Sequence, residues 1–285
     1  MIYFTENDID RIIEDDVPVG DMTTGLLGLD AFSAQIEVSA REAMTVCGTE
    51  EAVRIYRKAG LTVLKWVASG TRVDKGGLII RAKGNAAAVH LIWRTGGVMI
   101  EFASGIATRT AQLVSMAKGV RPDVSVAGTR KHPPYLKKMA LKALMAGGGT
   151  PHRTGLSDTI LIFREHLVFT GGYEKLGSVV SNVRNRQKER KIVVEAHTLA
   201  EALHCAQAGV DVIQVDKMPV DEFAICVKKC RQINPHVVML AAGGVNVNNA
   251  VDYVNAGADV LVTSWMYYAP PADIAVKIQP DPVVF

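Results

Sequence analysis

Residues 191–264 read KIVVEAHTLAEALHCAQAGVDVIQVDKMPVDEFAICVKKCRQINPHVVMLAAGGVNVNNAVDYVNAGADVLVTS and decide the fold. Short apolar runs alternate here with amphipathic stretches of helical period. The predicted strands are residues 192–195, 211–215, 237–241 and 259–262, and the predicted helices are residues 199–208, 220–233 and 247–256. Each strand and helix together take roughly 20 to 25 residues, close to the repeat of a β/α barrel. The strands are continuous apolar runs, which is typical of a parallel sheet covered on both faces.

The same alternation extends upstream to about residue 104. Strands are predicted at residues 124–127 and 159–162. Between them, Pro133 and Pro134 open a predicted helix over residues 135–146, which glycines 147–149 stop. A doubly wound open sheet would give a similar periodicity. We favour a barrel because polar residues recur just after several successive strands.

Residues 1–103 mix helix and strand signals instead and predict a separate domain. Thr5 is placed to cap a short helix, with Asp8 as its capping-box partner. The other predicted elements are strands at residues 35–39, 61–68 and 78–80, a helix over residues 50–59 ended by Gly60, and a helix from Asn85 to about Phe102.

Composition excludes several classes of protein. The 285 residues are 48% hydrophobic and carry a net charge of only +3, which argues against a general nucleic-acid binder. The four cysteines form no disulfide framework, and Cys226 and Cys230, one helical turn apart, lack further ligands nearby for a metal. The acidic N-terminus does not resemble a signal peptide, and no apolar run approaches the ~20 residues of a membrane span. We therefore expect a soluble cytoplasmic protein without nucleic-acid or membrane partners.

Polar and charged side chains gather at the carboxyl ends of the predicted strands, where parallel β/α proteins place their active sites. In chain order they are Thr129, Arg130, Lys131, His132, His152, Arg153, Glu195, His197, Asp216, Lys217, Gly243, Gly244, Thr263 and Ser264. The arginines and lysine suit a diphosphate. The glycines would let backbone N–H groups approach a phosphate, helped by the positive end of the helix behind them. The two carboxylates could hold sugar hydroxyls, coordinate Mg²⁺ or stabilise a cationic sugar.

Each of these residues also has a purely structural interpretation. Arg130 and Lys131 could lie in a solvated loop, Gly243 and Gly244 could be a simple turn, and Asp216 could cap the next helix. The functional interpretation is favoured because all of them fall at the same end of successive strands.

Several segments resemble one enzyme family nearly end to end. They are residues 14–24 (EDDVPVGDMTT), residues 104–108 (SGIAT), Thr129-Arg130-Lys131, residues 147–158 (GGGTPHRTGLSD) and Gly243-Gly244. They are similar to nicotinate-nucleotide pyrophosphorylase, the quinolinate phosphoribosyltransferase of NAD synthesis. Within that family the chain most resembles the ModD branch, associated with molybdenum transport genes.

The resemblance implies an α/β fold with two domains and a known reaction. An N-terminal α/β sandwich domain (residues 1–103, rejoined by residues 269–285) would precede a C-terminal incomplete parallel β/α barrel (residues 104–268). The family forms homodimers or larger homo-oligomers and, with Mg²⁺, moves ribose 5-phosphate from phosphoribosyl pyrophosphate to the ring nitrogen of quinolinate. By motif position, Lys131, Glu195 and Asp216 would be catalytic, with the two carboxylates as Mg²⁺ ligands. Thr129, Arg130, His152 and Arg153 would bind substrate, and Gly243, Gly244, Thr263 and Ser264 would lie on the 5-phosphate side.

The sequence departs from the family at four positions. Phe102 replaces an arginine that reaches into the partner's site, and Phe163 replaces an active-site lysine. Val193 and Leu240 replace two glutamates. Quinolinate is a dianion whose carboxylates each want a charge-assisted partner worth roughly 1.5–3 kcal/mol. Two phenylalanines remove two such partners, so Phe102 and Phe163 predict a changed acceptor site.

Four functions remain open from the sequence. The preferred one is a phosphoribosyltransferase that uses phosphoribosyl pyrophosphate, Mg²⁺ and a small aromatic acceptor other than quinolinate. The second is quinolinate phosphoribosyltransferase itself (nicotinate-nucleotide diphosphorylase, carboxylating) in NAD biosynthesis. A non-catalytic protein sensing phosphate or molybdate is the third, and a Schiff-base enzyme using Lys131 is the fourth.

Overall fold

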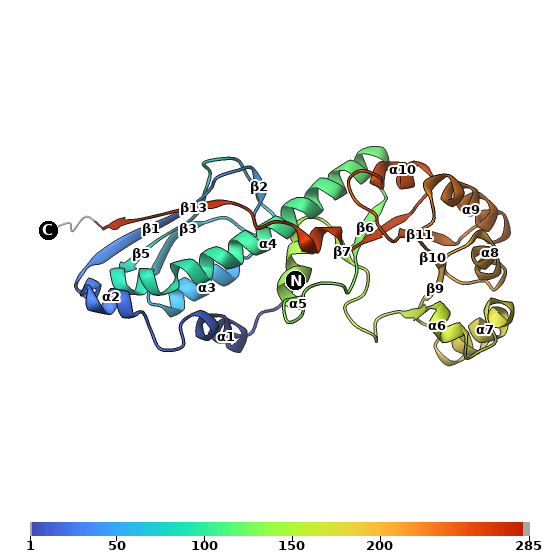
Figure 1. Ribbon diagram of the computed structural model, residues 1–285, viewed down its shortest axis with the longest axis horizontal. Helices are drawn as coiled ribbons and strands as arrows, with labels where there is room; N and C mark the ends of the chain where they lie inside the picture. The colour runs from blue at the N-terminus through green and yellow to red at the C-terminus, as the bar shows by residue number, and fades with distance from the viewer. Residues whose placement is uncertain (1, 282–285) are drawn as a thin grey trace. The chain divides into compact units, whose positions relative to one another are not determined.

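The computed structural model describes residues 2–281 and divides into two compact units. Within the described chain, unit 1 comprises residues 2–111, 132–148 and 266–281, and unit 2 comprises residues 112–131 and 149–265. Both combine helices with sheets, which confirms the predicted α/β class. Figure 1 traces the chain through them.

Unit 1 is built on a four-stranded antiparallel sheet in the order β13-β1-β5-β3. Its strands are β1 (Ser33–Ala40), β3 (Thr62–Trp66), β5 (Leu78–Asn85) and β13 (Ile274–Pro280). Buried and more exposed residues alternate along β1, so one face of the sheet meets the core. The last strand, β13, pairs with β1 along its whole length (Figure 1), so Ile274–Pro280 returns to the sheet formed by the N-terminal strands.

The helices of unit 1 largely follow the predicted pattern. They are α1 (Glu6–Asp16), α2 (Met22–Leu26), α3 (Thr49–Lys58), α5 (Lys137–Ala146) and the first part of α4 (Ala86–Val120); the short elements are η1 (Leu29–Ala31), β2 (Met44–Thr45) and β4 (Arg72–Val73). The capping box of Thr5 and Asp8 is present at the start of α1 as predicted. Helix α3 contacts β3 and β5 and covers the buried face of the sheet.

Helix α4 corrects the prediction that a helix ends near Phe102. It runs unbroken from Ala86 to Val120, so the predicted domain boundary at residues 103 and 104 falls inside one helix. The glycines within it serve close packing instead of ending it. A side chain at Gly96 would lie 2.8 Å from the Tyr56 ring, and one at Gly105 would collide with the carbonyl oxygen of Pro270. The glycines of α4 therefore mark positions of close packing, although each glycine weakens the helix by roughly 0.5–1 kcal/mol.

Helix α5 begins at Lys137, two residues later than predicted from Pro133 and Pro134. Tyr135 lies just before it with a φ of 65°, in the left-handed region. That conformation costs a residue with a Cβ atom about 1–2 kcal/mol, and it cannot continue a right-handed helix. The glycines that follow Ala146 end α5 as predicted.

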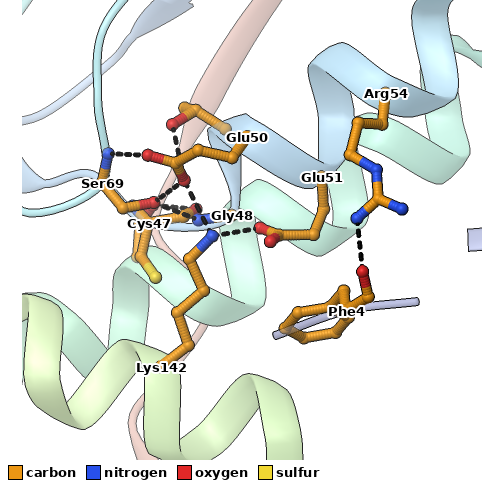
Figure 2. Close-up of polar contacts among 10 residues, drawn as sticks. Phe4, Cys47, Gly48, Glu50, Glu51, Arg54, Ser69 and Lys142 are labelled. Carbon is orange, nitrogen blue, oxygen red and sulfur yellow. Dashed lines mark hydrogen bonds and ion pairs between the residues drawn. The ribbon is translucent and has the colours of Figure 1, made fainter. Parts of the chain in front are cut away.

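Helix α5 is fastened to α3 by a half-buried ion-pair cluster, drawn in Figure 2. Lys142 Nζ lies 2.8 Å from Glu50 Oε2 and also donates to Glu51. Glu50 in turn accepts from the backbone N–H of Ser69 at 2.8 Å and from the Ser69 hydroxyl. Burial raises the pKa of the neighbouring Cys47 thiol to about 12, so the cysteine is neutral and inert.

Unit 2 is built on one parallel sheet of seven strands in the order β7-β6-β12-β11-β10-β9-β8. The strands are β6 (Ser125–Gly128), β7 (Thr150–Pro151), β8 (Ile160–Ile162), β9 (Ile192–Ala196), β10 (Val212–Asp216), β11 (Val238–Ala242) and β12 (Val260–Thr263). The sheet curls into a half-barrel, and in the described chain its edge strands β7 and β8 do not pair with each other. The predicted incomplete parallel barrel is therefore confirmed.

The inner face of this sheet is lined by an apolar row, one or two residues from each of six strands. The buried members are Ala127, Leu161, Val193, Val212, Leu240, Ala242 and Val262, with Phe163 packed against them. The outer face is covered by α8 (Leu199–Gln207), α9 (Val220–Ile233) and α10 (Ala250–Asn255). The strands are thus apolar on both sides, which explains their continuous apolar sequences.

Some elements of unit 2 were not predicted. They are β7, α6 (Arg164–Leu167), η2 (Tyr173–Lys175) and α7 (Leu176–Arg186), while η3 (Trp265–Tyr268) lies at the junction of the units. Helix α10 begins at Ala250, three residues after the predicted start. All four cysteines are free and buried, and the described residues contain no group of three or more suitable side chains around a metal position. No helix between residues 2 and 281 is long and apolar enough to cross a membrane.

Candidate active site

Thr129 and Ser264 meet at the carboxyl ends of the neighbouring strands β6 and β12. Their hydroxyl oxygens are 2.6 Å apart, and the backbone N–H of Thr129 donates to the carbonyl of Thr263 at 3.0 Å. Thr129 Oγ1 also accepts from the backbone N–H of Lys131, which shapes the loop carrying the cationic residues. The structure therefore brings these predicted residues together at one corner of the half-barrel.

Arg130, His152 and Arg153 form the cationic part of the same corner. The short strand β7 holds His152 there, since the His152 N–H donates to the carbonyl of Gly128 on β6 at 2.9 Å. Partial burial, and then the positive charge of Arg130, lower the pKa of the Arg153 guanidinium. Burial also lowers the pKa of His152, with Arg153 adding to the effect. Cations held close enough to disfavour one another are suited to an anionic ligand.

Glu195 and Asp216 lie at the carboxyl ends of the adjacent strands β9 and β10. Burial, and then the charge of Asp216, raise the pKa of Glu195. His197 lies between them, with Nε2 3.3 Å from Glu195 Oε1 and Nδ1 3.9 Å from Asp216 Oδ2. Gln214 Nε2 donates to Glu195 Oε2 at 2.7 Å. Two carboxylates this close together form a place where a cation would be stabilised.

Phe163 presents an aromatic ring at the end of β8. The ring is half-buried against the apolar inner row and stacks on His166, with centroids 5.7 Å apart and planes at 28°. The Arg153 guanidinium carbon lies 5.7 Å from the centroid of the Phe163 ring, within reach of a cation–π contact. His166 is fixed by the Phe163 backbone N–H, which donates to its Nδ1 at 2.9 Å. The position presents a flat apolar surface next to a guanidinium.

Gly243 and Gly244 form a tight loop after β11, with φ values of 80° and 85°. A side chain at Gly243 would lie 2.6 Å from Asp216 Oδ1 and would also collide with Lys217. The Thr263 hydroxyl ties this loop down by donating to the carbonyl of Val245 at 2.5 Å. The glycines therefore let the loop pass directly over the end of β10.

The structure corrects the prediction that a helix begins directly behind this loop. Because α10 starts at Ala250 and spans six residues, Gly244 does not stand at a helix N-terminus. The intervening backbone N–H groups of Asn246 and Asn248 are bound by the side-chain oxygens of Asn249 and Asn246. A phosphate bound here would be held by the glycine loop itself and not by a helix N-terminus.

The predicted residues thus fall into two groups. Unit 2 contains all of them except His132 and Phe102, which belong to unit 1, where Phe102 is half-buried on α4. The sequence prediction named His197, two residues after Glu195, but missed Gln214, which also contacts Glu195. The signal for Gln214 was a single polar residue inside the apolar strand VIQVD.

Comparison with known proteins assigns the family. Residues 21–104 match the N-terminal domain of quinolinate phosphoribosyl transferase, and residues 106–277 match its C-terminal domain. The chain is 34% identical to "Putative pyrophosphorylase ModD" of Pasteurella multocida over 98% of this chain and 99% of that protein. It is 27% identical to "Probable nicotinate-nucleotide pyrophosphorylase [carboxylating]" of Methanothermobacter thermautotrophicus, over 95% of this chain and 98% of that protein.

The fold agrees with a solved structure as well. The nicotinate-nucleotide pyrophosphorylase from Francisella tularensis superposes with a TM-score of 0.88 at 24% identity, covering 98% of this chain and 99% of that one. Both halves of the sequence, the half-barrel and the rejoined sheet therefore lead to one assignment. The chain belongs to the quinolinate phosphoribosyltransferase family and is a pentosyltransferase similar to nicotinate-nucleotide pyrophosphorylase.

Proposed function

We propose that this protein transfers the 5-phosphoribosyl group of phosphoribosyl pyrophosphate to a ring nitrogen of an aromatic acceptor other than quinolinate. The nitrogen supplies an electron pair to C1 of the ribose, the C1–O bond breaks, and diphosphate leaves with that pair. Positive charge develops on the sugar ring during this step. Glu195 and Asp216 are the carboxylates placed to stabilise it.

The cationic corner supports the diphosphate part of this proposal. Arg130 and Arg153 present planar forks that match phosphate oxygens, and Lys131 adds a compact charge next to them. Thr129 and Ser264 supply hydroxyl groups at the same corner. His152, with its lowered pKa, is neutral at pH 7 and offers a hydrogen bond without adding charge.

Mg²⁺ fits the carboxylate pair. Both side chains offer oxygen ligands, and a cation would offset the burial and the charge of Asp216 that together raise the pKa of Glu195. Mg²⁺ commonly binds one or two carboxylates and completes its shell with substrate oxygens and water, so Glu195 and Asp216 suffice as protein ligands. When bound, the ion would neutralise charge on the leaving diphosphate.

Phe163 is the observation that carries the choice of acceptor. Its ring lies against an apolar row where Val193 and Leu240 also stand, so this part of the half-barrel offers no cation for a second carboxylate. Arg153, above the ring, can still pair with a single negative charge. The surroundings therefore favour a flat acceptor that is neutral or carries one carboxylate.

Calorimetry with phosphoribosyl pyrophosphate and Mg²⁺ tests the donor half. We expect binding by the wild-type protein and a loss of about 10-fold or more for Arg130→Ala, because a charge-assisted hydrogen bond contributes roughly 1.5–3 kcal/mol. Arg186→Ala, an exposed arginine at the end of α7, is the matched control and should bind normally. Absence of binding to the wild type would rule the proposal out.

Quinolinate remains the second candidate acceptor because the archaeal relative carries the name of the carboxylating enzyme. A strain that lacks quinolinate phosphoribosyltransferase, grown without nicotinate, separates the two. We expect no rescue by the soluble wild-type protein, and rescue would favour quinolinate over the proposed acceptor.

We also propose that the protein works as a homodimer or larger assembly, as the family resemblance implies. Phe102 would then stand where the family places an arginine reaching into the partner's site. Sedimentation velocity of the purified chain measures the assembly state, and a monomer at micromolar concentration would oppose this proposal.

A further inference from the structure

Gln214 is a buried polar residue in the middle of the apolar inner face of the half-barrel. It is 6% exposed and belongs to β10. Side chains alternate along a strand, so Gln214 shares its face with Val212 and Asp216. Its register partners are Glu195 on β9 and Leu240 on β11. It therefore lies level with Glu195 and one inward-facing position deeper in the half-barrel than Asp216.

Only one end of the Gln214 amide has a partner. Nε2 donates to Glu195 Oε2 at 2.7 Å, and an ionised carboxylate can only accept, so this bond fixes which end of the amide faces β9. Oε1 points away from Glu195. This oxygen is buried and has no hydrogen-bond partner among the described residues. Leu240, on the other side, has no donor to offer.

A buried hydrogen-bond acceptor without a donor is unusual in a folded protein and calls for an explanation, and a bound ligand is one source of the missing donor. Here the oxygen belongs to the side chain that binds Glu195 in the proposed reaction centre, and its register neighbour on the other side, Leu240, is apolar.

We propose that Gln214 Oε1 accepts a hydrogen bond from the compound that receives the phosphoribosyl group. That compound is then a heteroaromatic ring bearing an amino, hydroxyl or amide N–H group. This inference rests on the proposed transferase function and specifies its acceptor. A carboxylate at the same place on the ring would be repelled, because Gln214 Oε1 and Glu195 both present oxygen lone pairs. Gln214 thus selects against quinolinate independently of the missing cations at Phe102 and Phe163.

Matched pairs of ring compounds test this inference. The probes are pyridine-3-carboxylates with an amino group at ring position 2, 5 or 6, each compared with the methyl compound of nearly the same size. Dissociation constants are measured by ligand-observed NMR with the wild-type protein, Gln214→Met and Ile213→Val. Met keeps the length of glutamine without the amide, and Ile213 is a buried neighbour on the opposite face of β10.

We expect at least one amino compound to bind the wild type about 10-fold or more tightly than its methyl counterpart, because the methyl group leaves the amide oxygen unpaired. Gln214→Met should bring that ratio close to one, and Ile213→Val should leave it unchanged. Ratios near one for all three pairs in the wild type, or a ratio that survives Gln214→Met, would overturn the inference.

Calorimetry with phosphoribosyl pyrophosphate and Mg²⁺ on the same protein separates this outcome from failure of the proposed function. If phosphoribosyl pyrophosphate binds but no amino compound binds more tightly than its methyl counterpart, the role of Gln214 is refuted and the transferase proposal stands. If an amino compound is preferred but phosphoribosyl pyrophosphate does not bind, the transferase proposal is refuted, and Gln214 is supported as the residue that recognises the ring substituent.

Discussion

Replacing Lys142 by methionine removes one charge from the cluster that joins α5 to α3. Methionine keeps most of the length of the side chain and fills the space, so the change isolates the ammonium group. Lys142 is 12% exposed and Glu51 only 5%, and both carboxylates lie within hydrogen-bond reach of Nζ. The variant therefore leaves Glu50 and Glu51 close together and without their shared cation.

The free energy of unfolding should fall by a large amount for the substitution of a single residue near the surface. Removing one partner of a buried ion pair costs about 3–5 kcal/mol, because the remaining charge is uncompensated. The pKa of Glu50 gives a separate estimate of this loss of stability. Burial alone would raise it, but hydrogen bonds from Lys142 and Ser69 outweigh that and lower the pKa to about 2 from 4.5. This difference corresponds to about 3 kcal/mol, and since Glu50 is 35% exposed, solvent screening reduces it to about 1–2 kcal/mol.

The pH dependence follows from the sign of that change. A carboxylate whose pKa is lowered by folding stabilises the protein above its unfolded pKa of about 4.5, and this stabilisation is lost as the pH falls towards 2. In Lys142→Met the Glu50 carboxylate can take up a proton more readily, because the hydrogen bond from Lys142 that lowers its pKa is lost. The deficit of the variant should therefore be greatest near pH 7 and shrink below about pH 4.

Urea unfolding of the full chain measures these effects, with Lys138→Met as the matched control. Lys138 lies on the same helix and pairs with Asp8 at 2.6 Å, but it is 46% exposed, so its removal should cost less than about 1 kcal/mol. A loss below about 1 kcal/mol for Lys142→Met, or equal losses for the two variants, would refute the assignment of Lys142 as a buried anchor.

Three further substitutions, the first with a matched control, probe the packing and the site. Gly147→Ala places a methyl group 2.5 Å from the Cβ of Thr110 and should cost about 1–3 kcal/mol in thermal unfolding, whereas Gly155→Ala, with open space around it, should change little. Gly119→Ala on the exposed end of α4 should raise the stability by about 0.5 kcal/mol, and a decrease would show that this end is not helical. Phe163→Lys should increase the affinity for quinolinate about 10-fold in calorimetry, and unchanged affinity would mean that Phe163 does not determine the acceptor.

Six of the seven half-barrel strands in the described chain could be located from sequence to within about one residue, because a buried parallel strand must be apolar on both faces and its helix neighbours must be amphipathic. The two-residue strand β7 was missed. The carboxyl-end residues followed directly, since the end of a strand fixes where the next side chains lie. Glu195 and Asp216 are examples, and the loop of Gly243 is another.

Other features depend on contacts that no local pattern reveals. The glycines of α4 at positions 96 and 105 allow close contacts with the Tyr56 ring and the Pro270 carbonyl, which come from distant parts of the chain. The unpaired oxygen of Gln214 follows from its register against Leu240, and register is set by the whole sheet. The site roles inferred from motif positions stay predictions until ligands or variants test them.

The path of the backbone between the two units limits how this protein can be dissected. The chain passes from one unit to the other at residues 111/112, 131/132, 148/149 and 265/266. A fragment cut at the apparent boundary, residues 104–268, would contain the half-barrel strands but would also take α5 away from α3. Its Lys142 would then be left beside an apolar helix face without Glu50 or Glu51. Gene fragments, domain swaps and fusion junctions chosen from the linear sequence would therefore create a defect in the piece they were meant to isolate.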